Sequence, residues 1–425
     1  MKSKMKTILT LLMALIVSVG VVSCGQGSKT EATKLEKLNW AEGNYKAITS
    51  MIEKYGKTSK DYDEKNKPYA VFDWDNTTIM NDVEEALLVY QIENLKFKMS
   101  PEEMSEVLKT NIPKEDFVSS ENNLAGQPVN IDKITADIVK DYTVLYNTYE
   151  GLKGQKKLED VQGLEEYTDF KAKLRYLYHA IGESFSSDVS YPWVTYLFKG
   201  MTSEEVAKLT EASNDYWLKQ ELAQETWKSS EKLPGEAGVV EVTFERGLRT
   251  VKEMQNLYAT LKDNGIDVYI CSASYIDVVK EFATNPKFGY NIDADKVFAM
   301  VLNKDKDGII QAELNPEYFQ TQGKGKTQTI EKFIAPKYNG AGPIMVGGDS
   351  NGDYEMLSDF KDTKISLIIN RLKSGKIGEL CQKAIDTTGK DDQRFFLQGR
   401  NNNTGEFIPT EKTILLNSKE EKLTK

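Results

Sequence analysis

Short apolar runs and longer amphipathic stretches alternate in two parts of the chain. The apolar runs have strand length and suit strands that are buried on both faces: residues 69–72, 267–271, 343–346 and 364–370. Apolar positions at helical spacing mark four helices around these runs: residues 35–55, 248–261, 275–283 and 326–333. Strands that alternate with helices predict an α/β fold in which helices flank a parallel sheet.

The segment between the first two strands has a different pattern. Residues 80–245 have helical spacing, many Glu, Lys and Leu residues and no second strong strand. We therefore expect an inserted, all-helical domain at 80–245, and a core formed by residues 35–79 and 246–425.

A polar turn joins two further short apolar runs. Residues 297–302 and 309–314 predict a hairpin around the segment 303–308. This segment mimics the start of a calcium-binding loop, but Leu314 stands at the twelfth position, where a bidentate Glu is required. The hairpin turn is therefore the preferred interpretation.

The N-terminus has the layout of a secretory signal. Three lysines among the first six residues precede an uncharged apolar stretch at 8–22, which is too short for a comfortable membrane span. Ser23 before Cys24 resembles a bacterial lipobox, so we expect a lipoprotein signal peptide at 1–23, lipid on Cys24 and a polar tether at 24–34. The alternative is an ordinary signal peptide that contains this cysteine. The lipoprotein would be exported and held by its lipid alone, in the cell envelope, at the periplasm or at the cell surface.

Charge and composition narrow the possible chemistry. The 425-residue chain has a formal net charge of −10, or about −13 without the signal lysines, which argues against nucleic acid as a partner. Only Cys271 and Cys381 remain besides Cys24, so we expect no disulfide framework. The sole histidine, His179, excludes a histidine-nucleophile phosphatase and metal sites built on several imidazoles. Carboxylates must then supply the catalysis.

Three of the apolar strands are followed by polar groups. Asp73 and Asp75 follow the first strand, Ser272 follows the second, and Asp349 and Asp353 follow the third. Ligands of open parallel sheets bind at the carboxyl ends of the strands, so we expect these groups to converge.

These residues resemble the four motifs of the haloacid dehalogenase superfamily. The first motif is similar to Asp73-Trp74-Asp75-Asn76-Thr77, the second to Ser272, the third to Lys326, and the fourth to Gly348-Asp349-Ser350-Asn351-Gly352-Asp353, in the required order. The resemblance implies a Rossmann-like core and a phosphatase. Asp75 favours phosphoryl transfer over dehalogenation, because dehalogenases of this superfamily lack that acid.

The resemblance also implies catalytic roles. Asp73 is the expected nucleophile, which forms an acyl phosphate, and Asp75 is the expected general acid and later base. Ser272 would hydrogen-bond a phosphoryl oxygen, and Lys326 would neutralise charge on the transferring group. Lys326 is preferred over Lys324 because it begins the helical pattern.

A cofactor and a set of binding residues follow from the same resemblance. Mg²⁺ is the expected cofactor, held by Asp73, the backbone carbonyl of Asp75 and Asp349, with Asp353 orienting its water ligands. The residues expected to contact the substrate near the motifs are Asn76, Thr77, Ser272 and Ala273, the last beside the start of a helix.

The position of the insertion resembles the cap of the phosphoserine phosphatase branch, and of phosphorylcholine phosphatase-like proteins in particular. Glu84-Glu85 and Tyr191-Pro192-Trp193 extend this resemblance beyond the motifs. It implies a small phosphomonoester substrate, with phosphorylcholine as the leading candidate, and places Glu84 and Trp193 near it. Aromatic faces bind quaternary ammonium groups, although aromatic residues on helices are also common in cores; those available are Trp74, Trp193, Tyr216, Trp217 and Trp227.

Several alternatives stay open at this point. The chain fits a phosphoserine phosphatase, a general phosphomonoester phosphatase, or a phosphomutase that retains a sugar bisphosphate. A non-catalytic, surface-binding lipoprotein on the same scaffold is a further class. The oligomeric state, the physiological substrate and the membrane that receives the anchor are not determined by the sequence.

Overall fold

The computed structural model describes residues 33–425, which belong to one compact unit. The predicted signal peptide at 1–23, the lipidation site Cys24 and nearly all of the tether at 24–34 lie outside the described residues. Within residues 33–425, no helix has both the length and the apolar character that crossing a membrane requires.

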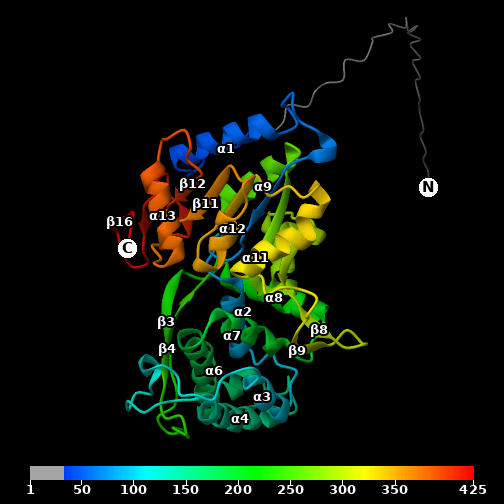
Figure 1. Ribbon diagram of the computed structural model, residues 1–425. Helices are drawn as coiled ribbons and strands as arrows, with labels where there is room; N and C mark the ends of the chain where they lie inside the picture. The colour runs from blue at the N-terminus through cyan, green and yellow to red at the C-terminus, as the bar shows by residue number, and fades with distance from the viewer. Residues whose placement is uncertain (1–32) are drawn as a thin grey trace, which may run out of the picture. The chain divides into compact units, whose positions relative to one another are not determined.

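The centre of the fold is a six-stranded sheet in which all neighbouring strands are parallel (Figure 1). The strands, in spatial order, are β12 (Phe395–Gln398), β11 (Ile365–Ile369), β10 (Met345–Gly348), β1 (Tyr69–Phe72), β6 (Asp267–Tyr275) and β7 (Val297–Met300). β1 is central, and its Val71 is in register with Val346 of β10 and Tyr269 of β6. The predicted α/β fold with a Rossmann-like core is confirmed.

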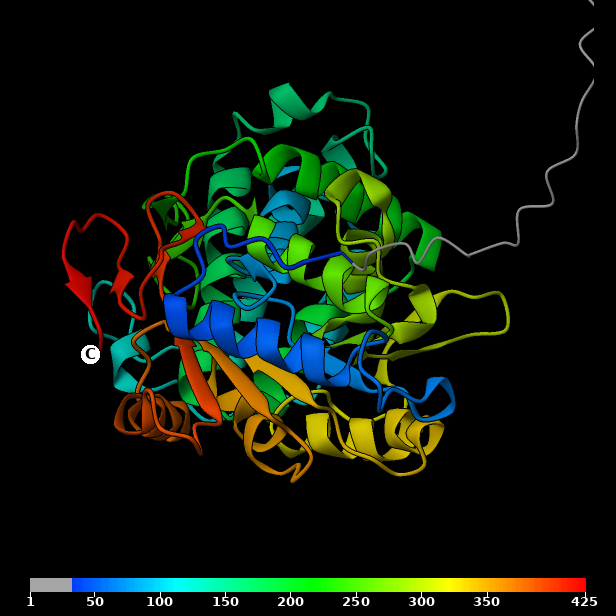
Figure 2. The same cartoon turned by 90° about the horizontal axis from the view of Figure 1, so that it is seen from above.

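Successive residues of β1 face opposite sides of the sheet and enter two separate hydrophobic clusters. Ala70 and Phe72 pack with apolar residues of α1 (Glu42–Tyr55) and α9 (Lys252–Asp263). Tyr69 and Val71 pack with apolar residues of α12 (Tyr354–Ser358) and α13 (Lys376–Thr387). Figure 2 shows α1, in blue, on one side of the sheet and the orange helices on the other. Burial on both faces explains why these strands read as continuous apolar runs.

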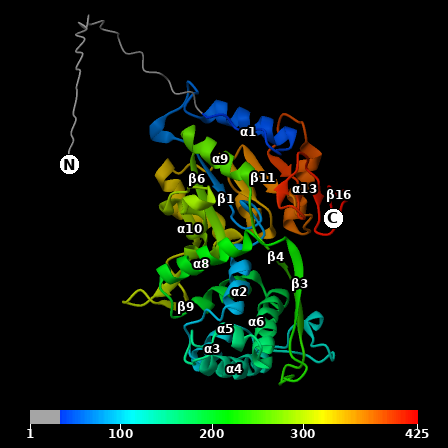
Figure 3. The ribbon, with the colours of Figure 1, turned by 180° about the vertical axis from the view of Figure 1, so that it is seen from behind.

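The inserted region begins after β2 (Ile79–Met80), which pairs with β5 (Arg249–Thr250), so both connections to the core lie side by side. Its helices gather at one end of the sheet (Figures 1 and 3). They are α2 (Val83–Glu93), α3 (Pro101–Leu108), α4 (Ile131–Thr148), α5 (Leu158–Val161), α6 (Glu165–Ser184), α7 (Ser187–Thr195) and α8 (Ser203–Trp217). These helices share a compact unit with the sheet, so the domain boundaries at 80 and 245 stay a prediction.

The expectation of an all-helical insertion is wrong in one part. β3 (Ala223–Lys228) and β4 (Glu241–Arg246) form an antiparallel hairpin within it. Most residues of these strands are polar and at least partly exposed, as in Gln224 and Glu225, so they lack the apolar run that marks the sheet strands.

Element boundaries differ from the prediction at several points. β7 is an edge strand of the large sheet, and the expected hairpin consists only of β8 (Leu302–Lys304) and β9 (Ile310–Leu314). The helix expected from Lys326 starts earlier, as α11 (Lys324–Thr329), and continues as a π-helix at Ile330–Ile334. β6 extends to Tyr275 and α10 (Ile276–Thr284) starts after it, so Ala273 does not open a helix.

A second small sheet, which the sequence pattern did not indicate, closes the chain. Its strands have only two residues each: β13 (Arg400–Asn401), β14 (Glu406–Phe407), β15 (Thr413–Ile414) and β16 (Glu421–Lys422). Strands this short carry no periodicity that a sequence reading can detect.

Candidate active site

A cleft of about 290 Å³ lies where the loops after the sheet strands meet the inserted region. The core contributes residues that follow or end β1, β6, β10 and β11, and the insertion contributes residues of α2, α6, α7 and β4. The cleft is thus at the carboxyl ends of the strands, where ligands of open parallel sheets bind.

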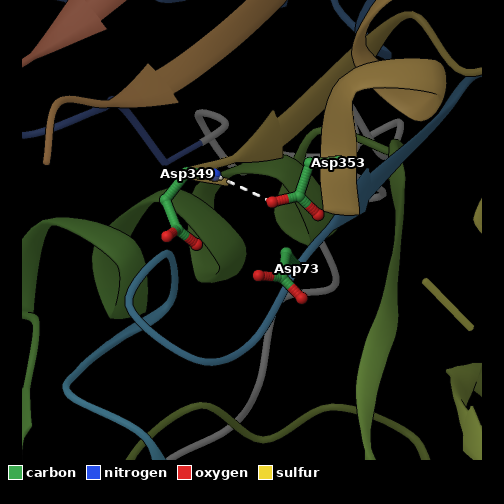
Figure 4. A group of neighbouring side chains, drawn as sticks. All are labelled: Asp73, Asp349 and Asp353. Atoms are coloured by element: carbon green, nitrogen blue, oxygen red, sulfur yellow. Dashed lines mark hydrogen bonds between the residues drawn. The ribbon is translucent and has the colours of Figure 1, made fainter. Parts of the chain in front are cut away.

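Three carboxylates, those of Asp73, Asp349 and Asp353, converge in this region (Figure 4). One oxygen of each lies within 4.8 Å of the others. The Asp73 N–H donates to the Gly347 carbonyl at 3.0 Å, so the neighbouring strands β1 and β10 deliver Asp73 and Asp349 side by side. The structure therefore brings together acids that are more than 270 positions apart in the chain.

Lys326 lies between two of these acids. Its Nζ is 2.5 Å from Asp73 Oδ1 and 2.6 Å from Asp353 Oδ1, and the side chain is almost completely buried. Burial alone would lower the pKa of Lys326, but Asp353 and Asp73 outweigh it and the pKa is raised, so the ammonium stays charged. Lys324 is exposed and does not line the cleft, which agrees with the choice of Lys326.

Asp353 is already fully engaged by donors of the chain. Oδ2 accepts the N–H groups of Asp349 and Ser350 at 3.0 Å, and Oδ1 accepts Lys326 Nζ. Asp353 thereby fixes the loop after β10 and the position of the lysine. Such a carboxylate suits an organising role better than a direct metal contact.

The remaining acids fit a small divalent cation. Asp73 Oδ2 has only a long contact of 3.4 Å with Thr77, and Asp349 Oδ1 accepts the Thr77 hydroxyl at 2.9 Å. Buried carboxylate oxygens of this kind are the hard donors that such a cation prefers. The side chain of Asp75 is not part of this cluster, and its backbone carbonyl stays a predicted ligand.

Asp75 has the environment of a proton donor. Its Oδ1 accepts the Val83 N–H and its Oδ2 accepts the Ser274 hydroxyl, both at 2.7 Å. Burial, followed by the nearby charges of Asp82 and Asp73, raises the pKa of Asp75 well above its usual range. The environment of Asp75 therefore favours its protonated form over that of an ordinary carboxylate.

Ser272 is placed differently from its expected role. The residue is fully buried and does not line the cleft; its Oγ lies 3.4 Å from Asp75 Oδ2 and accepts the Ser274 N–H at 3.1 Å. Ala273 and Ser274 line the cleft instead. The direct contact of Ser272 with a phosphoryl oxygen stays a prediction, whereas its position beside the general acid candidate is part of the structure.

Of the neighbouring residues Asn76 and Thr77, the first lines the cleft and the second supports a carboxylate from behind it. Asn76 lines the cleft with φ near 60°, and its carbonyl and side-chain oxygens both accept the buried Arg400 guanidinium. Thr77 is fully buried and hydrogen-bonds Asp349, so it orients a carboxylate and does not line the cleft.

Glu84 lines the insertion side of the cleft with one oxygen free. Oε2 accepts the Tyr275 N–H at 3.0 Å, while Oε1 is buried and has no partner among the described residues. Burial, and then Asp82, raises the pKa of Glu84 to about 8. Glu85 beside it pairs with Arg175 at 2.8 Å. With Glu245 these residues form an acidic wall, defined here as Asp82, Glu84, Glu85 and Glu245.

Trp193 does not contact the cleft, so the expectation that it binds the substrate is wrong. Its side chain is fully buried, its Nε1 donates to the Leu108 carbonyl at 2.9 Å, and its ring stacks on Tyr178. The other aromatic candidates also lie off the cleft lining: Trp74, Tyr216, Trp217 and Trp227. Tyr178 and Tyr191 are the aromatic side chains that line it.

Sequence reasoning gave no site role to several polar or aromatic groups of the lining. They include Asp82, Tyr178, Tyr191, Glu245, Arg371 and Lys373. Arg371 Nη1 is 2.7 Å from Asp349 Oδ2. Burial alone would raise the pKa of Asp349, but Arg371 and Lys373 outweigh it and the pKa is lowered. The Tyr191-Pro192-Trp193 segment had been noticed, and the tyrosine is the member that reaches the cleft.

Comparisons with known proteins give two informative matches. No family model matches the chain. A phosphorylcholine phosphatase of Pseudomonas aeruginosa is 24% identical over 372 residues, which cover 82% of this chain and 83% of that protein. A conserved, functionally unknown protein from Anaerococcus prevotii is 41% identical, with a TM-score of 0.86, over 90% of this chain and 99% of that one. A substrate-bound phosphoserine phosphatase aligns at 12% identity over 72% of this chain and 87% of that one, with a TM-score of only 0.30, which carries no conclusion.

Proposed function

We propose that the chain is a phosphatase-type hydrolase of the haloacid dehalogenase superfamily, and that it hydrolyses a small phosphomonoester through a phosphoaspartyl intermediate on Asp73. The observation that carries the proposal is the contact of Asp73 with the buried Lys326, beside the Asp349 carboxylate and in one cleft with Asp75, whose pKa is raised.

In the first step an oxygen of Asp73 attacks phosphorus, and the bond from phosphorus to the leaving oxygen breaks. The lysine ammonium at 2.5 Å from Asp73 stabilises the negative charge that the transfer brings to this point. Asp75 gives its proton to the leaving oxygen, which departs as an alcohol. The raised pKa of Asp75 keeps that proton available.

In the second step the roles reverse. Asp75, now ionised, takes a proton from water, and the water oxygen attacks the phosphorus of the acyl phosphate. The bond between phosphorus and the Asp73 oxygen breaks, which returns the carboxylate and yields inorganic phosphate. The Ser274 hydroxyl and the Val83 N–H hold Asp75 in place through both steps.

Mg²⁺ is the cofactor we propose, with Asp73 and Asp349 as the residues that would hold it. When bound, it supplies positive charge that favours the ionised form of Asp73, whose pKa is otherwise raised by burial and by Asp353.

We propose a substrate whose leaving group carries a positive charge, such as phosphorylcholine. The support is the acidic wall, the unpartnered Glu84 Oε1 and the neighbouring rings of Tyr178 and Tyr191, which together suit an ammonium group. The name of the Pseudomonas relative agrees with this choice. A phosphorylated amino acid also carries an ammonium group and is the second candidate.

The proposed setting is extracytoplasmic. It rests on the signal-like N-terminus and on Cys24 as a lipid attachment point. Globomycin treatment of expressing cells, or a Cys24→Ser variant, should leave an unprocessed or unlipidated chain. Identical processing of the variant and the native chain would contradict the lipid anchor.

The function is tested with a screen of small phosphomonoesters that includes phosphorylcholine, phosphoserine and p-nitrophenyl phosphate. Each is assayed with Mg²⁺ and with a chelator, and free phosphate is the readout. We expect release of phosphate that needs Mg²⁺, with the fastest turnover on a substrate with a cationic leaving group. No turnover of any ester would leave the non-catalytic lipoprotein as the better interpretation, and retention of a bisphosphate without release would indicate a mutase.

A further inference from the structure

The turn that follows β11 carries two cations into the cleft. β11 pairs with β10, the strand that leads to Asp349, so the ends of these two strands are neighbours. Arg371 and Lys373 in this turn both line the cleft. Neither belongs to the motifs that the sequence displays.

Asn370 fixes the base of this turn. It is buried, its Oδ1 accepts the Leu372 N–H at 3.0 Å, and its Nδ2 donates to the carbonyls of Glu411 and Leu423 at 2.8 and 2.9 Å. The small C-terminal sheet therefore holds the turn in a defined position. Through these contacts the sheet helps to position the two cations of the turn at the cleft.

Leu372, between the two cations, has φ of 56°. This left-handed conformation is strained for a bulky residue and persists only where the surroundings impose it. The Leu372 side chain is buried, while Arg371 on one side of it and Lys373 on the other line the cleft. The strained residue thus lets the turn present the two cationic side chains that flank it to one place.

The two cations differ in their partners. Arg371 is paired with Asp349 at 2.7 Å. Lys373 has no hydrogen-bond or ion-pair partner within residues 33–425. Lys376, three residues later, pairs with Glu355 and does not line the cleft. Lys373 is therefore a free ammonium group beside the carboxylate cluster.

Charge in the cleft is separated between its two sides. The acidic wall repels an anion, whereas Lys326, Arg371 and Lys373 lie on the core side near Asp349. A phosphoryl group has three non-bridging oxygens, and Lys326 is already shared by two aspartates. A further cation would therefore stabilise the negative charge of the phosphoryl oxygens that Lys326 does not contact.

We propose that Lys373 binds a non-bridging oxygen of the phosphoryl group, and that Arg371 positions Asp349 next to it. This inference rests on the proposed function, and it adds a phosphate-binding residue outside the four motifs. The opposing charges then orient the ester, with its phosphoryl group toward Lys373 and its cationic leaving group toward Glu84.

The test compares Lys373→Met with Lys376→Met, which removes a lysine of the same segment outside the cleft. Two quantities are measured at fixed Mg²⁺: the dissociation constant of inorganic phosphate by calorimetry, and KM and kcat for the best substrate. Loss of a charge-assisted contact should raise the phosphate dissociation constant and KM roughly tenfold or more in Lys373→Met. We expect kcat to change much less, Lys373→Arg to recover most of the affinity, and Lys376→Met to match the native chain.

Failure of this inference is distinguishable from failure of the proposed function. If the native chain turns over esters but Lys373→Met binds phosphate as tightly as Lys376→Met, the phosphate-binding role of Lys373 is wrong. If no ester is hydrolysed while phosphate binding still depends on Lys373, the role stands and the function is wrong. A native chain that neither binds phosphate nor hydrolyses esters overturns both. Equal melting temperatures of the variants, expected for an exposed side chain, exclude misfolding as the cause.

Discussion

The two sides of the cleft are built in opposite ways. On the core side two cations are paired before any substrate arrives, and one is not. Lys326 pairs with Asp73 and Asp353, and Arg371 pairs with Asp349, whereas Lys373 has no partner within residues 33–425. On the insertion side Glu85 pairs with Arg175, but Glu84 keeps an unpartnered oxygen and two tyrosines line the cleft. Preorganised charge lowers the barrier of a chemical step, while unsatisfied groups await a ligand. We therefore infer that the core side carries out phosphoryl transfer and that the insertion side selects the substrate.

The largest effect should come from Asp73→Asn, which removes the nucleophile and keeps the side chain's size. We expect turnover to fall roughly 10⁴-fold or more on every substrate. Phosphate release from p-nitrophenyl phosphate and from phosphorylcholine measures this. Asp305→Asn is the matched control: Asp305 only accepts N–H groups within the β8–β9 turn, and its loss should leave turnover unchanged. A drop on one substrate only would contradict the assignment of chemistry to the core.

Asp75→Asn should have the next largest effect, a loss of about 10²- to 10⁴-fold on alkyl phosphates in kcat/KM, which reports formation of the phosphoaspartyl intermediate and not its hydrolysis. The loss should be smaller on p-nitrophenyl phosphate, whose leaving group needs no proton. The raised pKa of Asp75 means that the native rate of leaving-group departure falls as the pH rises through this pKa and the proton is lost. Initial rates across pH test this sign, because the alkaline decline should disappear in Asp75→Asn. An equal loss on both leaving groups would remove the acid role.

Glu84→Gln tests the insertion side and should act through affinity. Above pH 8, KM for a substrate with a cationic leaving group should rise roughly tenfold, while KM for p-nitrophenyl phosphate stays close to the native value. The Glu84 carboxyl has a pKa of about 8, so its charged form gains weight as the pH rises. Native KM for the cation should therefore fall through pH 8, and in Glu84→Gln this dependence should vanish. Glu102→Gln, exposed at the start of α3, is the control.

The smallest effect on activity should come from Trp193→Phe. The variant loses the hydrogen bond to the Leu108 carbonyl, and we expect the free energy of unfolding to fall by about 1 kcal/mol. Selectivity between cationic and neutral leaving groups should not change. Denaturant unfolding and the ratio of kcat/KM values measure the two quantities. A changed ratio would place Trp193 in recognition after all.

The difference between the core and the insertion also explains which site residues the sequence could predict. The core acids follow strands with clear apolar patterns and Lys326 lies in the first turn of a helix, and the order of the motifs restricts where they meet. Trp193 was misplaced because an aromatic residue on a helix reads the same in a core as in a binding site. The hairpin β3–β4 was missed because its strands have no continuous apolar run, although the alternation of Val242 and Phe244 with polar residues is a signal of a half-buried strand.

The turn that follows β11 shows a second kind of feature that the sequence pattern does not reveal. Lys373 looks like any surface lysine, and its place depends on the left-handed conformation of Leu372, for which leucine gives no signal. Asn370 holds that conformation through Glu411 and Leu423, more than 40 positions away. The contact of Ser274 with Asp75 was not expected for a related reason, since β6 continues past the expected end of the strand and carries Ser274 to the cleft.

The central claim is a covalent bond between phosphorus and the Asp73 carboxylate. The most direct measurement is rapid quenching of Asp75→Asn during turnover of p-nitrophenyl phosphate, followed by mass spectrometry of the digested chain. In this variant the leaving group departs unaided while the attack of water is slow, so a phosphoryl group should accumulate on the peptide that contains Asp73. A chain that releases phosphate without ever becoming phosphorylated, or that carries the phosphoryl group on another residue, would contradict the account.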